Sequence, residues 1–253
     1  MTSQLARDLA GLRDRREVLL GLGGTALLAG AVGKASEPSV PCLLTPMETR
    51  GPFPADGTRG PNALALRGIE RSDIRASFAG MESTAEGVPL DLTIALIGAA
   101  GRCAPLAGWG LYLWHNDARG EYSLYGLPNA NYLRGLQQSG ADGTVRFRTI
   151  LPGCYGGRAP HMHFEVFSSA AAALTGQRGL LASQFALPED RCRAVYESDR
   201  RYGASLANLQ QWPTARDFVF ADASPAELTL ETIALEGSPA SGFRGTARVV
   251  VNA

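Results

Sequence analysis

The stretch that decides the fold lies at residues 161–167 and reads His161-Met162-His163-Phe164-Glu165-Val166-Phe167. Apolar and other residues alternate along it, which is typical of a β-strand with one buried face. Because successive side chains of a strand point to opposite faces, we expect His161 and His163 to project together. The chain has only three histidines, so this pair predicts half of a metal site. Two ordinary surface histidines are the alternative.

The loop before this strand is rich in glycine and contains Tyr155 and Arg158. A phenolate oxygen is a hard ligand and suits a hard cation. Tyr155 is therefore a candidate third ligand beside the two imidazoles.

Other segments have the composition or alternation of strands. They are residues 89–97, 109–114, 144–150, 226–235 and 245–251. A short helix is expected at 204–211. Many short strands with little helix indicate an all-β fold of the β-sandwich type. Residues 36–87, rich in proline, glycine and charge, are expected to form an extended arm and first turns before a core at 88–253.

The charge balance excludes some partners. The 253 residues contain 24 Lys and Arg against 24 Asp and Glu. Such a chain has no basic field for nucleic acid and no cationic helix for a membrane surface. Its length suits one domain with a substantial core.

Residues 1–35 have the features of a twin-arginine signal segment. Arg15 and Arg16 precede an apolar, glycine-rich stretch that is shorter than a membrane span. We therefore expect an exported protein whose mature chain has no membrane span. An ordinary apolar N-terminal helix is the alternative.

Four cysteines follow that segment: Cys42, Cys103, Cys154 and Cys192. An even number in an exported chain permits two disulfides in three possible pairings, so few free thiols are expected. Four buried, reduced thiols are the alternative.

A second motif lies upstream and reads Leu113-Trp114-His115-Asn116-Asp117-Ala118-Arg119-Gly120-Glu121-Tyr122-Ser123. Followed by Thr149-Ile150-Leu151-Pro152-Gly153-Cys154-Tyr155 and Arg158-Ala159-Pro160-His161-Met162-His163, it resembles the intradiol ring-cleavage dioxygenases. Their sequences show W-x-x-x-x-x-G-x-Y, then T-I-x-P-G-x-Y, then R-x-P-H-x-H. The segments 45–53 and 236–251 resemble the family's first and last parts. The resemblance covers about residues 40–253 and is strongest to the short, exported members.

This resemblance implies one non-haem Fe(III) per chain, with Tyr122, Tyr155, His161 and His163 as ligands. Two phenolates suit a hard ferric ion because they lower its charge. His115 matches no ligand position, and we interpret it as structural.

The resemblance also implies an activity. The enzyme would use O2 to cleave a catechol-type ring between its hydroxylated carbons, giving a muconate-type diacid. The substrate would displace Tyr155, Arg158 would stabilise negative charge on it, and Gln184 would line the pocket. The partners are thus a small aromatic diol and O2. The sequence does not specify which catechol binds, the oligomeric state, or the signal cleavage site.

Two departures from the family pattern stand out. Pro54 replaces a frequent tyrosine, and Asn116 replaces a cysteine frequent in exported relatives.

Two other functions compete with the dioxygenase. One is a cupin-like metal enzyme that uses His161, His163 and Glu165. The other is a non-catalytic exported β-sandwich binding module.

Overall fold

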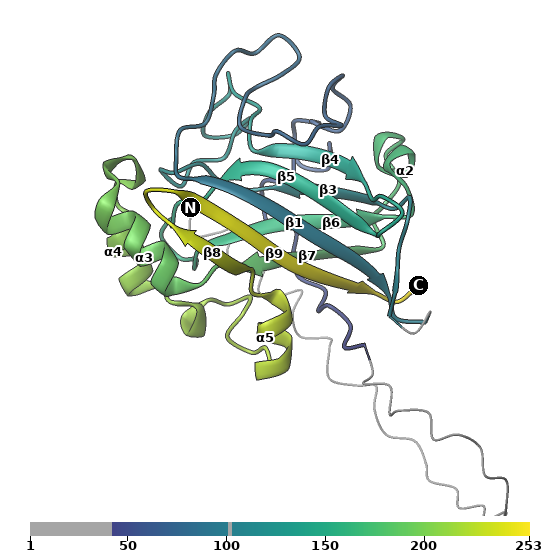
Figure 1. Cartoon of the computed structure of the whole chain (residues 1–253). Helices are drawn as coiled ribbons and strands as arrows, with labels where there is room; N and C mark the ends of the chain where they lie inside the picture. Colours follow the sequence, from purple (N-terminus) through teal and green to yellow (C-terminus); the bar gives the residue numbers. More distant parts are fainter. Residues whose placement is uncertain (1–41, 101–102) are drawn as a thin grey trace, which may run out of the picture. The chain divides into compact units, whose positions relative to one another are not determined.

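The computed structural model describes residues 42–100 and 103–253. Two β-sheets face each other (Figure 1). One contains, in order, β2 (Ala104–Pro105), β1 (Pro89–Gly98), β9 (Gly242–Val251) and β8 (Ala234–Ser238), and β5 (Thr144–Ile150) also pairs with β1. The other contains β4 (Arg134–Gln138), β3 (Gly110–Trp114), β6 (His161–Phe167) and β7 (Leu181–Ala186). β1 and β9 run parallel, and the other paired strands run antiparallel.

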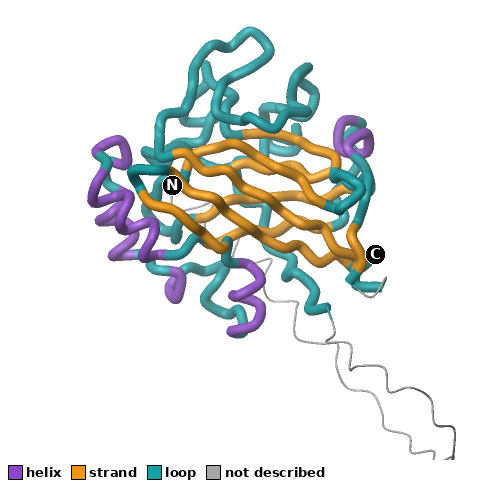
Figure 2. The backbone as a smooth tube through the Cα atoms, in the orientation of Figure 1, coloured by secondary structure: helices purple, strands orange, loops and turns teal. Residues whose placement is uncertain are grey.

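Short helices and loops surround the sheets (Figure 2). The helices are α2 (Ala170–Leu174), α3 (Glu189–Ser198), α4 (Ser205–Gln211) and α5 (Pro225–Glu231), with 3-10 turns at Arg200–Tyr202 and Thr214–Arg216. The all-β sandwich expected from the sequence is confirmed. No helix in the described ranges combines the length and apolar character needed to cross a membrane.

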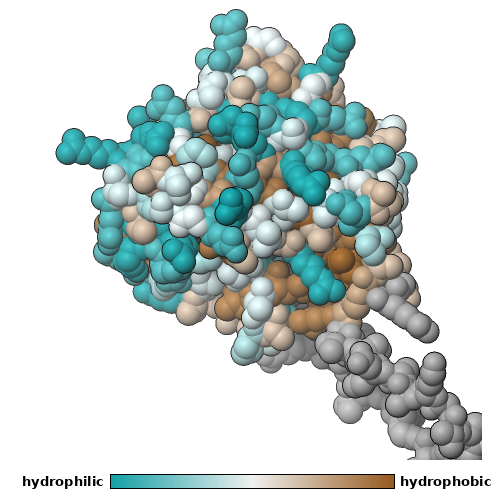
Figure 3. All heavy atoms as spheres, viewed as in Figure 1, coloured by the Kyte–Doolittle hydropathy of each residue, from teal (hydrophilic) through white to brown (hydrophobic). Residues whose placement is uncertain are grey.

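The main core lies between the sheets. Leu92 and Ile94 of β1 pack in one cluster with Phe147 of β5 and with Phe164 and Val166 of β6. Removing such apolar area from water stabilises the fold by roughly 25 cal/mol per Å². The opposite face of the β1–β9 sheet carries hydrophilic residues among weakly polar and apolar ones (Figure 3), including the exposed side chains of Asp91, Arg146 and Arg244.

The second face of β6 is also buried. Part of the segment 42–87, which contains turns and isolated β-bridges, packs against this side of the β3–β6 sheet together with α2. The resulting cluster includes Ile69, Trp114 of β3 and Ala173 of α2. His161 and His163 are consequently only 1% and 2% exposed. The alternative of two surface histidines is therefore wrong. The alternating sequence identified the apolar face of β6 but gave no sign that the face with the histidines is covered as well.

The expected strands at 89–97, 109–114, 144–150, 161–167 and 245–251 and the helix at 204–211 are all confirmed within a few residues. The strand expected at 226–235 is wrong over most of its length. α5 forms there because the Ser224 hydroxyl accepts from the Glu227 N–H while the Glu227 carboxylate accepts from the Ser224 N–H, and Pro225 occupies the first turn.

One disulfide joins Cys42 and Cys103, whose Cα atoms are 5.9 Å apart. Cys154 and Cys192 are buried free thiols in the main core. The expectation of few free thiols is therefore wrong for these two. Burial raises the pKa of Cys154 to about 12, so its thiol behaves as a small apolar group. The expected signal at residues 1–35 lies outside the described residues.

Candidate metal centre

Four donor atoms converge on the outer face of β6. Tyr122 comes from the β3–β4 loop, Tyr155 from the β5–β6 loop, and His161 and His163 from β6 itself. The two Nε2 atoms lie 3.1 Å apart. The Tyr122 hydroxyl is 3.3 and 3.2 Å from them, and the Tyr155 hydroxyl is 3.3 Å from His161 Nε2. Donors at about 2.1 Å from one metal lie roughly 3.0–3.4 Å from each other, so these separations fit one shared cation.

His161 presents a lone pair to this centre. His161 Nδ1 lies 2.7 Å from the Ala159 carbonyl, which can only accept, so Nδ1 carries the proton and Nε2 the lone pair. Burial, and then nearby positive charge, lowers the pKa of both imidazoles well below the usual range. Two neutral imidazoles whose Nε2 atoms face each other are suited to a shared cation.

The tyrosines can supply charge to that cation. Burial raises the pKa of Tyr122 well above 10 and also raises the pKa of Tyr155. Both groups are therefore neutral phenols without a metal. A highly charged ion stabilises phenolates and reverses this preference. Two phenols and two neutral imidazoles thus fit a hard metal such as ferric iron.

Two glycines let the tyrosine loops approach. Gly120 has a φ of +87°, and a Cβ there would lie 3.0 Å from Tyr155 Cβ. A Cβ on Gly153 would lie 2.5 Å from the Ala118 carbonyl oxygen. The Gly153 N–H donates to the Asp117 carbonyl at 2.9 Å. These contacts give a physical reason for glycine in both loop motifs.

Aromatic and arm residues enclose the centre. Trp114 stacks on His163 with ring centroids 5.1 Å apart and planes 5° apart. Phe53 packs on Tyr122 at 4.7 Å between centroids. Gly51 lies so close that a Cβ there would be 3.1 Å from His163 Cε1. The segment 51–53 therefore covers part of the centre and restricts access for water.

Arg158 is buried beside the four donors. Its Nη1 donates to His161 Nε2 at 3.2 Å, and its Nε donates to Asp217 Oδ2 at 2.9 Å. Although burial opposes its charge, Tyr155 and Asp217 raise the pKa of Arg158 above its ordinary value. A permanent cation thus lies next to the centre.

Gln184 lies on β7 opposite His163. Its Oε1 accepts from Arg158 Nη2 at 2.7 Å, and its Nε2 donates to the Thr49 carbonyl at 2.8 Å. The side chain is completely buried. Gln184 is therefore near the centre, but its polar atoms bind protein groups instead of lining an open pocket.

His115 lies outside the cluster. Its ring nitrogens lie 2.7 Å from the Asn116 carbonyl and from the Thr149 hydroxyl, and burial lowers its pKa to about 4. The structural role expected from the sequence agrees with these contacts. Asp217, by contrast, was not identified by any sequence motif, because its contact with Arg158 joins distant segments.

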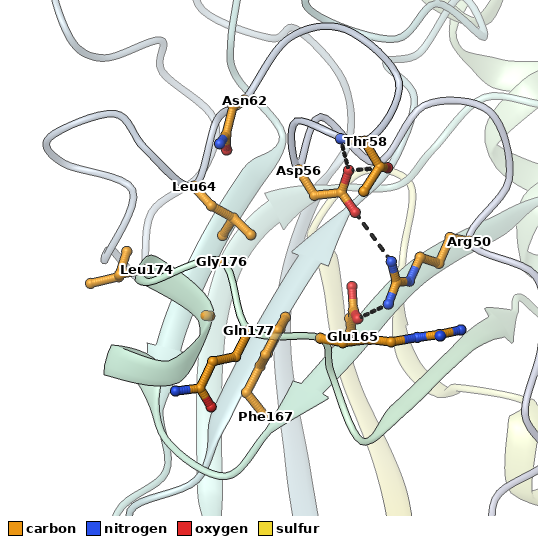
Figure 4. A pocket seen from close by; sticks show the side chains of 12 residues that line it. Arg50, Asp56, Thr58, Asn62, Leu64, Glu165, Phe167, Leu174, Gly176 and Gln177 are labelled. Carbon is orange, nitrogen blue, oxygen red and sulfur yellow. Dashed lines mark hydrogen bonds and ion pairs between the residues drawn. The ribbon is translucent and has the colours of Figure 1, made fainter.

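Glu165 takes no part in the cluster. Its carboxylate accepts from Arg50 and from the Gly179 N–H, and Arg50 also pairs with Asp56 (Figure 4). Arg50, Asp56 and Glu165 line a cavity of about 300 Å³ that includes none of the four donors. Throughout residues 42–100 and 103–253, no three His, Cys, Asp or Glu side chains are grouped to hold a metal. Because Arg50 and the Gly179 N–H hold its carboxylate, Glu165 does not join the two histidines as the cupin-like alternative requires.

Comparison with known proteins supports one class. The chain is 30% identical over 154 residues to catechol 1,2-dioxygenase 1 of Acinetobacter lwoffii, a match covering 53% of this chain and 45% of that protein. The chain thus spans less than half the length of this curated relative. No protein-family model matches it.

Solved structures share the fold. An intradiol ring-cleavage dioxygenase from Tetranychus urticae superposes with a TM-score of 0.63 at 22% identity, covering 83% of this chain and 95% of that chain. The dioxygenase domain of a dioxygenase carbohydrate-binding protein fusion from Streptomyces sp. SirexAA-E gives a TM-score of 0.50 at 25% identity, covering 83% and 98%. The fold is that of a dioxygenase-type β-sandwich. The chain shares the fold of the intradiol ring-cleavage dioxygenase from Tetranychus urticae, and the sequence match to a catechol dioxygenase agrees with the resemblance seen in its motifs.

Proposed function

We propose that this protein is a non-haem Fe(III) dioxygenase that cleaves a catechol-type ring between its hydroxylated carbons. The observation that carries the proposal is the convergence of Tyr122, Tyr155, His161 and His163, with donor separations of 3.1–3.3 Å, in a chain of this fold. When bound, ferric iron would supply a Lewis-acidic centre that activates the diol toward O2. Adding O2 to a catechol balances to a muconate-type diacid without an external reductant.

The two tyrosines have different roles in this proposal. Tyr122 is 3% exposed, whereas Tyr155 is half-buried and is followed by Gly156 and Gly157. Tyr155 is therefore the side chain that can move aside when the diol enters. Its phenolate accepts a proton from the incoming diol, which matches the high pKa that burial gives this phenol.

Arg158 and the arm complete the site. The guanidinium faces the developing negative charge of the substrate, and such a preorganised cation is most effective where water is scarce. Residues 51–53 supply one wall of the substrate space, next to His163 and Tyr122. Pro54 follows this wall where the family often has a tyrosine, so this side of the substrate space should differ from that of the family.

Metal analysis with visible spectra tests the proposal. Iron-loaded wild type should hold about one iron per chain, show phenolate-to-metal charge transfer and consume O2 with a catechol. Tyr122→Phe should lose most of the iron and colour. Tyr125→Phe is the control, because Tyr125 lies on the same loop and its hydroxyl accepts from the Ala55 N–H outside the cluster. A colourless, iron-free wild type would favour the binding-module alternative and sink the enzyme proposal.

We also propose export through a twin-arginine signal at residues 1–35. The Cys42–Cys103 disulfide supports an oxidising compartment. Replacing Arg15 and Arg16 together by Lys should leave precursor in the cytoplasm, while Arg7→Lys with Arg13→Lys should not. Appearance of the mature form outside the cytoplasm with both substitutions at Arg15 and Arg16 would contradict this proposal.

A further inference from the structure

Asp217 is a completely buried carboxylate beyond the recognised motifs. It lies directly after the turn Thr214–Arg216. Its oxygens accept from Arg158 Nε at 2.9 Å and Nη2 at 3.3 Å, and from the Ala159 and Val219 N–H groups at 2.6 and 2.9 Å. A buried carboxylate with four donors is well satisfied and fixed in direction.

These contacts determine where Arg158 points. A guanidinium has five N–H groups in one plane. Asp217 takes Nε–H and one Nη2–H, and Gln184 takes an Nη2–H at 2.7 Å. Because the group is planar, fixing this edge also fixes the direction of Nη1. Nη1 then lies 3.2 Å from His161 Nε2.

The contact with His161 uses the lone pair that a metal would need. When a cation takes this lone pair, Arg158 Nη1 loses its acceptor there. Its N–H groups remain aimed at the centre and can donate to an anionic oxygen of a diol. This step rests on the proposed function, which supplies the metal and the diol.

We propose that Asp217 is a positioning residue that holds Arg158 with Nη1 directed at the substrate oxygens. Asp217→Asn keeps the size of the side chain but replaces one acceptor oxygen by an NH2 group that faces other donors. This substitution weakens the contacts that fix the Nε and Nη2 side of the Arg158 guanidinium. It leaves the four candidate metal ligands unchanged.

The matched experiment compares Asp217→Asn with Asp222→Asn, an exposed carboxylate of the same segment. Asp217→Asn should retain the iron and the visible band while kcat falls on the order of a hundredfold and KM rises. Asp222→Asn should match wild type in every measurement. Unchanged kcat in Asp217→Asn, or a parallel loss of iron, colour and activity, would overturn the proposal.

A double-mutant cycle separates positioning from folding. Adding Asp217→Asn to Arg158→Ala should change kcat by less than about twofold, because the residue acts through Arg158. A further large loss would contradict this. If Asp217→Asn does not fold, Arg158→Lys provides the test. Lysine keeps the charge but lacks the planar fork, so it should lose nearly as much turnover as Arg158→Ala, and retained turnover would overturn the proposal.

Catechol binding under nitrogen distinguishes this proposal from the proposed function. Catechol should shift the visible band of iron-loaded wild type, and Asp217→Asn should require a higher catechol concentration for the same shift. If wild type binds catechol but consumes no O2, the dioxygenase proposal fails while the positioning proposal is still tested. Equal affinity in Asp217→Asn and wild type would count against Asp217 alone.

Discussion

Gly120 shows how one residue controls the approach of the two tyrosine loops. Gly120→Ala adds a Cβ 3.0 Å from Tyr155 Cβ at a φ of +87°. We expect a loss of roughly 1–2 kcal/mol from the backbone conformation, and weaker iron binding because Tyr155 must shift. Gly60→Ala is the control, since Gly60 has a φ of +109° and nothing within 4 Å of its added Cβ. It should lose stability but keep its iron, as measured by urea unfolding and metal analysis. Equal iron loss in both variants would disprove the role of the contact.

Residues within short motifs were predictable, and residues joined by long-range contacts were not. His161 and His163 follow from strand alternation, while Tyr122 and Tyr155 follow from motif position. Asp217 has no such signal, because only the folded chain brings it to Arg158. The sequence also did not predict that Gln184 donates to the Thr49 carbonyl, because this contact joins the arm to β7.

Helix α5 contains a buried carboxylate without a hydrogen-bond partner in the described part of the chain, that of Glu231. Burial raises its pKa from 4.5 to about 8. The folded protein therefore binds this proton more tightly than the unfolded chain, and stability falls as the pH rises through this range. Glu231→Gln should remove this fall and stabilise the protein at the alkaline end by on the order of a few kcal/mol. Denaturant unfolding at both ends of the range measures it.

The exposed Glu236 on β8 provides the control for this prediction. Glu236→Gln should leave the pH dependence of stability unchanged. If Glu231→Gln keeps the wild-type pH dependence, Glu231 does not carry the proton in the folded state.

Some helices and strands could be predicted from the sequence more accurately than others. β1, β5 and β6 alternate clearly because one face packs in the main core. α5 was mistaken for a strand because its length is short and its capping box, between Ser224 and Glu227, was not recognised. The burial of the second face of β6 depends on the arm, whose residues carry no periodic pattern of their own.

The disulfide determines the thiol count of the whole molecule. Unfolded, unreduced protein should titrate two thiols, Cys154 and Cys192, and four after reduction. The bond joins residues 61 positions apart, so its reduction should lower stability by roughly 4 kcal/mol in the chain-entropy model. Thiol titration with unfolding curves checks both values. Four thiols before reduction would disprove the disulfide, and none would show that Cys154 and Cys192 are also paired.

Product analysis after turnover in isotopically labelled O2 tests the central claim most directly. The iron-loaded protein should convert a catechol to a cis,cis-muconate-type diacid that carries both labelled oxygen atoms, without an external reductant. Arg158→Ala should keep its iron and colour while forming this product on the order of a hundred times more slowly. A semialdehyde product from cleavage outside the two hydroxylated carbons, or no oxygen uptake with any catechol, would contradict the assignment.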